Sequence, residues 1–485
     1  MIFTSIDFII FLSIVFSISL VIPYKIKWMF LLAASYFFYG NWNIDYLVLL
    51  IIPTLITYLI AIKMNSIKLT VSRKRLFIIG LILTLAGLII FKYADFIITT
   101  FSVLMSLFVD KISLKPVHLI HPIGISFFTF KLVSYLIDVY RADIKPEKHL
   151  GYFALYISFF PQIFMGPIDR ARHFIPELKK RVPFDIDRVI SGVQLIAWGV
   201  FKKMVIADRI SIFVNEVFQN PQQQGINLIF GAYFYAFQIY CDFSGYTDMA
   251  IGISRILGFK SIRNFNFPYF STSISQFWNR WHISLSTWLR DYLFLPIAYS
   301  TMRRLNSSQP KRIKAEAWGY TAGMFVTMFL GGLWHGASWT FVLWGKIHGL
   351  YLIASYSTKK ARKKIMKTFR LNKFSRLHRF FSILITFNLV SFAWIIFRSE
   401  SFHKALIYLK NIQFSIPDIG IAHLIFNLCL IIFFVGLEIL YKNRDKFNFI
   451  KKMPRLSKIA AFALFICFII IFSVDVSNEF IYFQF

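Results

Sequence analysis

The sequence predicts an all-α polytopic membrane protein, with about 11 transmembrane helices and additional re-entrant and amphipathic helices. Three observations support this class. Of the 485 residues, 57% are hydrophobic and 58 are Phe. Only 16% are charged, whereas a typical soluble domain has about 25%. The apolar residues also gather in runs of roughly 20, the length that crosses a bilayer as a helix.

The composition excludes several other classes of protein. A mean hydropathy of +0.61 rules out a soluble enzyme, a disordered chain and a collagen-like fibre. The net charge is +31, which in a soluble protein would indicate nucleic-acid binding. Most lysines and arginines lie instead in short loops between apolar runs, where they mark the cytoplasmic side of a membrane. We therefore expect no nucleic-acid partner.

The cysteines and the first residues give two further expectations. Cys241, Cys429 and Cys467 lie in apolar surroundings without CxxC spacing, so neither a disulfide framework nor a metal site is predicted. The segment Met1-Ile2-Phe3 lacks the basic region of a cleavable signal peptide. The first apolar run is therefore expected to be a retained span.

The candidate spans are the apolar runs. They lie at residues 5–22, 29–42, 45–62, 76–94, 119–140, 188–206, 225–241, 318–334, 338–356, 380–397, 421–440 and 459–474. The run 151–166 is also apolar, but Gly166-Pro167 follows it. No internal repeat or low-complexity linker is found, so residues 1–485 are predicted to form a single domain.

Positive charges orient these runs in the membrane. Clusters of lysine and arginine follow the first, third and fifth runs, at residues 25–27, 63–75 and 141–148. Because such loops stay in the cytoplasm, the N-terminus is expected outside. Residues 170–188 carry six more basic residues and should also lie inside, so run 151–166 is expected to enter the membrane and return without crossing it. Irregular backbone at that depth is tolerated only inside protein or beside a cavity, which implies a cavity reachable from the cytoplasm.

The C-terminal part shows the same charge signal. Segment 359–379 has ten lysines and arginines and no acidic residue, and segment 442–458 has seven basic residues and one acidic residue. Both are predicted to be cytoplasmic. Residues 475–485 then form an extracytoplasmic tail.

Region 241–300 is too polar for a standard span and too aromatic for an ordinary loop. This mixture favours a partly buried core around a polar site. Within it, Asp242, Asp248 and Arg255 are expected to pair inside the membrane, a structural role.

His335 is the first candidate for catalysis. It lies in Phe329-Leu-Gly-Gly-Leu-Trp-His-Gly-Ala-Ser-Trp339, between two apolar spans. An ionisable residue at membrane depth indicates a functional site, and a neutral imidazole can act as a general base. The neighbouring glycines allow close approach of a ligand or of another helix. The alternative is a structural histidine that hydrogen-bonds between helices.

His282 is the second candidate, in the stretch from Phe277 to Tyr292. The spacing predicts one helix, with Asn279, His282 and Ser286 on a polar stripe opposite an aromatic face. The alternative is an interfacial amphipathic helix with a tryptophan belt. His348, one turn after Trp344, is expected to be structural.

Several blocks together resemble the membrane-bound O-acyltransferase family, in particular its alginate and peptidoglycan O-acetyltransferase branch. They cover most of residues 119–350. The blocks are His121-Pro-Ile-Gly-Ile-Ser-Phe-Phe-Thr-Phe130, Tyr135-Leu-Ile-Asp-Val-Tyr-Arg141, Phe159-Phe-Pro-Gln-Ile-Phe-Met-Gly-Pro-Ile168, Cys241-Asp-Phe-Ser-Gly-Tyr-Thr-Asp-Met249, Phe277 to Tyr292 and Gly331 to Gly336.

The resemblance implies a site and a direction of transfer. The family's active-site histidine falls on His335, and a second position, histidine or asparagine, falls on His282. The fold implied has helices around a central tunnel, with a cytosolic acyl donor and an extracytoplasmic acceptor. In this branch the donor is acetyl-CoA, used as a substrate with no bound cofactor, and a separate SGNH-like extracytoplasmic acetyltransferase passes the acetyl group to a polysaccharide. The location implied is the cytoplasmic membrane.

The chemistry of thioester transfer assigns further residues. A base must deprotonate a hydroxyl, donors must stabilise an oxyanion, and water must be excluded. His335 would be the base, and His282 or Asn279 would orient the thioester. Trp278, Trp334 and Ser244 are assigned to substrate binding. Two alternatives stay open: D-alanyl transfer from a carrier protein to teichoic acid, and a transporter or flippase, which would carry ion-coupling carboxylates or an inverted repeat.

The final residues suggest an acyl relay at Tyr482. The chain ends in Phe480-Ile-Tyr-Phe-Gln-Phe485, which is similar to the end of the small membrane peptide of the teichoic-acid D-alanylation system. A tyrosyl ester would keep the acyl group activated for a second transfer, because a phenol is a better leaving group than an alkyl alcohol. Phe480 and Phe485 would anchor the tail. The alternative is an aromatic anchor at the membrane interface.

Overall fold

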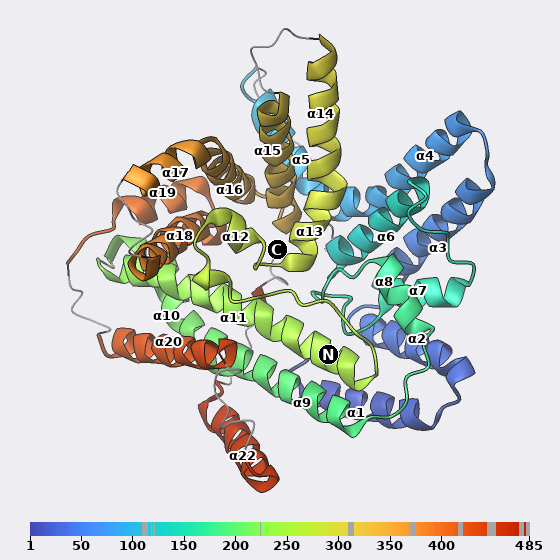
Figure 1. Cartoon of the computed structure of the whole chain (residues 1–485), viewed down its shortest axis with the longest axis horizontal. Coiled ribbons are helices and arrows are strands. Elements are labelled where there is room, and N and C mark those ends of the chain that lie inside the picture. Colours follow the sequence, from blue (N-terminus) through green and yellow to red (C-terminus); the bar gives the residue numbers. More distant parts are fainter. Residues whose placement is uncertain are drawn as a thin grey trace. The chain divides into compact units, whose positions relative to one another are not determined.

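The computed structural model describes residues 1–108, 115–117, 119, 122–223, 225–308, 315–368, 375–415, 421–443, 453–474 and 480–481. Every regular element in this part of the chain is a helix (Figure 1), so the predicted all-α class is confirmed. Within the chain, contacts cluster into two compact units, and the single-domain expectation stays a prediction. The first unit is Met1–Ile196, Met249–Arg263 and Gly336–Ser338, and the second unit is Ala197–Asp248, Asn264–His335 and Trp339–Phe485.

The first unit contains the N-terminal helices. They are α1 (Ile6–Val21), α2 (Tyr24–Gly40), α3 (Asp45–Ser66), α4 (Thr70–Leu88), a π-helical turn (Ile89–Tyr93), α5 (Ala94–Met105), α6 (Ile125–Tyr140), α7 (Leu150–Ser158), α8 (Ala171–Leu178) and most of α9 (Ile186–Val200). Helices α3, α4 and α6 pack against one another, and α2 packs against α7.

The second unit contains the remaining elements. They are a π-helix (Phe201–Ala207), α10 (Asp208–Gln219), a 3₁₀ turn (Pro221–Gln223), most of α11 (Asn227–Ile256), a 3₁₀ turn (Pro268–Phe270), α12 (Ile274–Trp278), α13 (Ile283–Leu289), a π-helix (Arg290–Phe294), α14 (Leu295–Ser308), α15 (Ala315–His335), α16 (Trp339–Ser357), α17 (Lys359–Thr368), α18 (Ser375–Arg398), α19 (Phe402–Lys410), α20 (Ile421–Lys442) and α22 (Arg455–Phe472). Helix α15 packs against α14 and α16, and α16 packs against α18.

Six helical stretches among the described residues are long and apolar enough to cross a membrane. They are Asp45–Ser66, Thr70–Met105, Ile186–Gln219, Arg376–Arg398, Ile421–Lys442 and Arg455–Phe472.

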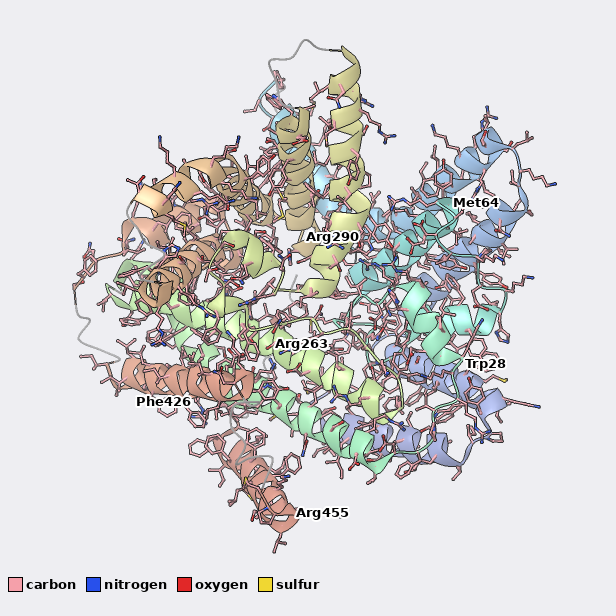
Figure 2. All side chains as sticks on the ribbon, viewed as in Figure 1. Trp28, Met64, Arg263, Arg290, Phe426 and Arg455 are labelled. Atoms are coloured by element: carbon pink, nitrogen blue, oxygen red, sulfur yellow. The ribbon has the colours of Figure 1, made fainter. Side chains whose placement is uncertain are left out.

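The other predicted spans form helices that are shorter or more polar. Helix α1 has 16 residues, and α11 carries Asp242 and Asp248 among its apolar residues. The long apolar helices keep many large apolar side chains exposed, such as Phe426 of α20, which is 45% exposed (Figure 2). Such a surface suits contact with lipid.

The structure agrees with the prediction that run 151–166 does not cross the membrane. Helix α7 has nine residues, which extend about 14 Å, whereas the hydrocarbon core is about 30 Å thick. Residues 159–170 then follow as irregular, buried chain.

Buried polar groups hold this irregular chain inside the first unit. The Lys131 ammonium of α6 donates to the Tyr156 carbonyl at 3.1 Å and to Gln162 Oε1 at 2.9 Å. The Gln162 amide in turn donates to Asp169 Oδ2 at 2.7 Å. These bonds satisfy groups that lipid could not hydrogen-bond.

In the second unit, two glycines bring α15 and α16 into backbone contact. A Cβ atom added at Gly332 would lie 2.3 Å from the Phe341 carbonyl oxygen, and one added at Gly345 would lie 2.2 Å from the Met328 carbonyl oxygen. Real Cβ atoms do not approach backbone this closely. The sequence predicted that the glycines near His335 allow close approach of a ligand or of another helix. Gly332 allows the close approach of another helix.

This contact predicts that Gly345→Ala destabilises the protein. The added methyl group must separate α15 from α16, and overpacking of this kind costs roughly 1–3 kcal/mol. Gly436→Ala is the matched control, because a Cβ added there meets nothing within 4 Å. Thermal unfolding of the two purified variants should show a lower Tm for Gly345→Ala alone. Equal Tm values would mean that the helices are not in close contact.

Candidate active site

His335 is the last residue of α15 and is 4% exposed. Its imidazole faces two aromatic rings edge-on. The ring centroid of Trp344 from α16 lies 4.9 Å away, and that of Phe397 from α18 lies 5.3 Å away. The close packing of α15 on α16 is what allows Trp344 to reach this histidine.

His282 is fully buried and immediately precedes α13. Its ring contacts Phe243 of α11 at 4.7 Å and Trp334 of α15 at 5.8 Å. Trp334 also lies 4.9 Å from His335, its sequence neighbour. One tryptophan therefore contacts both of the predicted histidines, which the sequence separates by more than 50 positions.

These rings belong to one buried group in the second unit, which we name the aromatic–histidine cluster. Neighbouring members have ring centroids 4.9–5.8 Å apart. The members are Trp278, Trp281, His282, Trp334, His335, Trp344, His348, Trp394 and Phe397. The cluster contains no carboxylate, ammonium or guanidinium group. It offers imidazoles in apolar surroundings from which water is largely excluded.

The predicted continuous helix from Phe277 to Tyr292 is wrong. Helix α12 ends at Trp278 and α13 begins at Ile283. Between them, His282 has the left-handed backbone φ 41°, ψ 55°, which interrupts a right-handed helix. Asn264 stabilises the break, since its carbonyl accepts from the Ile283 N–H at 2.8 Å and its Oδ1 accepts from the Ser284 N–H at 3.1 Å. A strained backbone of this kind is typical of functional sites.

The break also separates the predicted polar stripe. Asn279 is exposed at the C-terminal end of α12, whereas His282 is buried. Ser286 bonds to the Trp281 carbonyl at 2.9 Å. Burial lowers the pKa of His282 to about 3, so this imidazole is neutral at neutral pH.

The structure places the four predicted substrate-binding residues in different surroundings. Trp278 and Trp334 belong to the aromatic–histidine cluster. The Trp278 indole N–H donates to His348 Nδ1 at 3.3 Å. Asn279 makes no described contact with either candidate histidine. Ser244 lies elsewhere in the second unit, where its hydroxyl accepts from Lys202 Nζ at 2.9 Å.

Ser244 adjoins a second buried group, the lysine–carboxylate cluster, which sequence reasoning missed. It consists of Lys202, Lys203, Asp208, Asp242 and Asp248. Lys203 Nζ lies 2.6 Å from Asp242 Oδ1 and 2.8 Å from Asp208 Oδ1, and Lys202 Nζ lies 2.5 Å from Asp248 Oδ2. The sequence does carry one signal for this cluster, because two lysines lie within the apolar run 188–206 and charges inside a span usually have partners.

The local backbone exposes these lysines to the carboxylates of α11. Both lysines lie in the π-helix Phe201–Ala207, an irregularity that is frequent at functional sites. A Cβ added at Gly245 of α11 would lie 2.7 Å from the Gly199 carbonyl oxygen, so the two backbones touch. The expectation that Arg255 pairs with these aspartates is wrong, because Arg255 donates to the Ser191 carbonyl within the first unit.

The C-terminal tail enters this lysine–carboxylate cluster. Phe480 is fully buried, with its ring 4.5 Å from Lys203 Nζ and 5.0 Å from the Tyr246 ring. The Ile481 N–H donates to Asp242 Oδ2 at 2.9 Å. The described part of the tail is thus held inside the protein rather than at a lipid interface. Tyr482 and Phe485 lie outside the described residues.

Across the described ranges, no group of three or more His, Cys, Asp or Glu side chains is arranged to hold a metal ion.

Comparison with known proteins identifies the family. The model of the membrane-bound O-acyltransferase family matches residues 148–385. The probable alginate O-acetylase AlgI of Pseudomonas syringae pv. tomato is 36% identical over 434 residues, which cover 86% of this chain and 78% of that protein. The chain belongs to the membrane-bound O-acyltransferase family. As a membrane-bound O-acyltransferase it is an enzyme embedded in a membrane.

Two other relatives of this membrane-bound O-acyltransferase are named for different activities. The peptidoglycan O-acetyltransferase of Helicobacter pylori is 32% identical over 423 residues, covering 82% of this chain and 75% of that protein. The teichoic acid D-alanyltransferase of Bacillus subtilis is 32% identical over only 291 residues, covering 59% of this chain and 71% of that protein. The aligned segment is thus longer for the two O-acetylating relatives than for the D-alanyltransferase.

The left-handed backbone predicts that His282→Asn is tolerated better than His282→Ala. Both changes remove the ring, but asparagine adopts this conformation at lower cost than alanine, by about 1 kcal/mol. At the exposed helical residue His403 the order should reverse, because alanine is the better helix former. Thermal unfolding of the four variants measures this, and the same order at both positions would contradict it.

The buried tail predicts that Phe480→Ala releases Ile481 from Asp242. Removing a buried phenylalanine ring costs about 3–5 kcal/mol, so the tail should spend far more time undocked. Hydrogen–deuterium exchange of the C-terminal peptide should accelerate by more than about tenfold. The control is Phe414→Ala, at a residue that is 84% exposed, and it should leave the exchange rate unchanged. Slow exchange in both variants would show that Phe480 does not hold the tail.

Proposed function

We propose that this enzyme takes an acetyl group from a cytosolic thioester, acetyl-CoA, and delivers it across the cell membrane for O-acetylation of an extracytoplasmic polysaccharide. The acceptor class is an exopolysaccharide such as alginate, or peptidoglycan. A separate extracytoplasmic acetyltransferase of the SGNH-like type completes the transfer. The observation that carries the proposal is His335, a buried histidine at the end of α15 within the aromatic–histidine cluster.

His335 has the surroundings that a general base for acyl transfer requires. A hydroxyl that attacks a thioester must lose its proton as the new C–O bond forms, and His335 accepts that proton. The C–S bond then breaks, and the CoA thiolate takes the proton from His335 and leaves as the free thiol. The surrounding indole and phenyl rings exclude water, which would otherwise hydrolyse the thioester. His282, neutral and in contact with the same Trp334, is placed to orient the thioester carbonyl.

Tyr482 is the hydroxyl that we propose receives the acyl group first. Phe480 and Ile481, which come just before it in the sequence, are docked in the lysine–carboxylate cluster. Attack by the phenol on the thioester forms a tyrosyl ester and releases CoA. A hydroxyl of the partner acetyltransferase then displaces the phenol, which regains its proton.

The carboxylates of the lysine–carboxylate cluster favour this proposal over transport. A transporter would use free intramembrane carboxylates to couple ions. Asp208 and Asp242 are instead both paired with Lys203, and Asp248 is paired with Lys202. A D-alanyl donor is the remaining alternative, and a direct assay with both thioesters separates the two.

His335→Ala should abolish acyl transfer while the protein still folds. Loss of a general base lowers the rate by about 10²–10⁴-fold. The measurement is thiol release from acetyl-CoA by the purified enzyme, with an unchanged Tm as evidence of folding. His403→Ala, at an exposed histidine of α19, is the control and should retain full activity. Transfer near the wild-type rate in His335→Ala would make that histidine structural.

Tyr482→Phe tests the relay, because it keeps the ring and deletes only the hydroxyl. Polysaccharide O-acetylation in cells should be lost, since no other group at that position can carry the ester. Tyr299→Phe, at a residue 56% exposed on α14, is the matched control and should have no effect. If O-acetylation continues undiminished in Tyr482→Phe, the tail is an anchor and not a relay.

A further inference from the structure

A cavity in the first unit is not part of the proposed reaction. It has a volume of about 560 Å³ and lies between α2, α3 and the start of α7. This volume falls within the range of about 300–1,000 Å³ that is usual for small-molecule sites. Its lining combines aromatic, aliphatic and basic side chains, and its polarity is graded from one end to the other.

Helix α3 shows the grading on one wall. Its C-terminal end carries Lys63, and the basic segment that follows it is predicted to be cytoplasmic. Tyr58 lines the cavity nearest that end, with Leu55 one turn deeper and Ile51 a further turn beyond. The order along the membrane normal is therefore charge, phenol and aliphatic side chain.

Helix α2 repeats this order on the opposite wall. Its first turn carries Lys25 and Lys27, at the end predicted to be cytoplasmic. Trp28 lines the cavity next, Leu32 follows one turn deeper, and the phenol of Tyr36 lies a further turn beyond. On both walls an aromatic side chain near the cytoplasmic end is followed by an aliphatic one, which matches the headgroup, interfacial and acyl-chain regions of a phospholipid.

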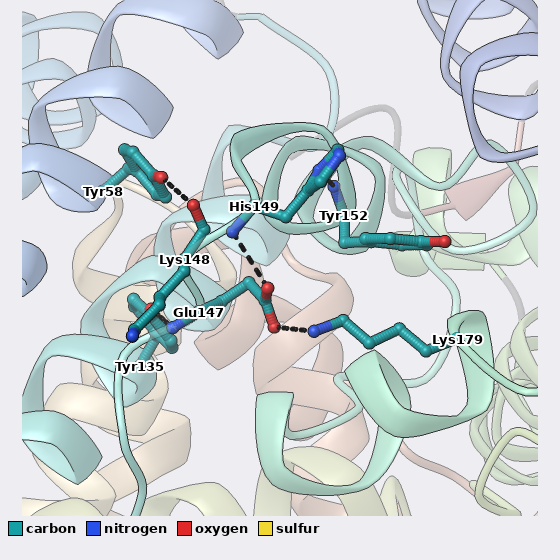
Figure 3. Close-up of polar contacts among 7 residues, drawn as sticks. All are labelled: Tyr58, Tyr135, Glu147, Lys148, His149, Tyr152 and Lys179. Atoms are coloured by element: carbon teal, nitrogen blue, oxygen red, sulfur yellow. Dashed lines mark hydrogen bonds and ion pairs between the residues drawn. The ribbon is translucent and has the colours of Figure 1, made fainter. Parts of the chain in front are cut away.

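The loop before α7 supplies positive charge at the polar end. Lys148 and His149 line the cavity, and the adjacent Glu147 does not cancel them. The Glu147 carboxylate pairs with Lys179 at 2.5 Å and accepts the His149 backbone N–H at 3.0 Å (Figure 3). The negative charge of Glu147 is already balanced by Lys179, which does not line the cavity. The Lys148 ammonium therefore remains available to bind an anion.

This polar end is also fixed in place. The Tyr58 hydroxyl donates to the Lys148 carbonyl at 2.5 Å, which ties the loop to α3 (Figure 3). His149 Nδ1 accepts from the Tyr152 N–H at 3.4 Å, and its ring lies 4.6 Å from Trp28. With Nδ1 as acceptor, the neutral imidazole carries its proton on Nε2 and can donate it to an anion.

We propose that this cavity binds one anionic phospholipid of the cytoplasmic leaflet. The phosphate lies beside Lys148 and His149, and an acyl chain extends along Leu32, Leu55 and Ile51. Basic pockets between membrane helices on the cytoplasmic side bind anionic headgroups in this manner. The site is independent of the acyl-transfer chemistry, since all of these residues belong to the first unit.

The test is a lipid titration of the delipidated full-length protein in nonionic detergent. Dioleoyl phosphatidylglycerol should raise Tm with a saturable dependence on its concentration, and dioleoyl phosphatidylcholine should do so less. Lys148→Gln should weaken the apparent Kd for phosphatidylglycerol about fivefold, the effect of one lysine near a headgroup. Lys145→Gln is the matched control, because Lys145 is an exposed lysine of the same loop that does not line the cavity.

A second variant tests the acyl-chain part, and a soluble anion tests the source of the phosphate. Leu55→Trp should fill the cavity and abolish the saturable stabilisation by phosphatidylglycerol. Glycerol 3-phosphate, which carries a phosphate without acyl chains, should not reproduce that stabilisation. The proposal is overturned if Lys148→Gln and Lys145→Gln behave alike, if Leu55→Trp binds normally, or if glycerol 3-phosphate stabilises the wild type through Lys148 as strongly as the lipid does.

Discussion

The backbone contact between α15 and α16 determines where the candidate catalytic histidine lies. Gly332 and Gly345 remove the side chains that would hold the two helices apart, and each faces a carbonyl oxygen of the other helix. At this separation Trp344 of α16 reaches the imidazole of His335 at the end of α15. The aromatic–histidine cluster is assembled around that pair, because Trp344 also contacts His348 and Trp394.

The second unit contains two buried clusters of polar side chains that differ in charge. The aromatic–histidine cluster is uncharged and suits proton transfer in a dry environment. The lysine–carboxylate cluster is ionic, with two lysines paired to three aspartates. Buried ion pairs are often no more stabilising than apolar residues of similar size, so stability alone does not explain this cluster. In our proposal the cluster docks the tail, since Asp242 accepts from the Ile481 N–H and Lys203 faces the Phe480 ring.

Sequence patterns predicted those features that depend on composition and local context. The all-α class follows from the apolar runs, and His335 stands out as an ionisable residue between two spans. Other features depend on tertiary partners. The break before α13 needs the caps that Asn264 provides, and helical periodicity cannot report a left-handed residue such as His282. The pairing of Lys203 with Asp242 joins positions 39 residues apart, and the sequence pattern assigned that carboxylate to Arg255 instead.

The central proposal is that His335, as the general base, activates the Tyr482 hydroxyl to take an acetyl group directly from acetyl-CoA. It is tested most directly by peptide mass spectrometry of the purified full-length enzyme after incubation with acetyl-CoA. This account predicts an acetyl ester on the C-terminal peptide that contains Tyr482 in the wild type, and none in His335→Ala although the tail remains docked. An unmodified tail in a wild-type enzyme that consumes the thioester would contradict the account, as would equal acetylation of both proteins.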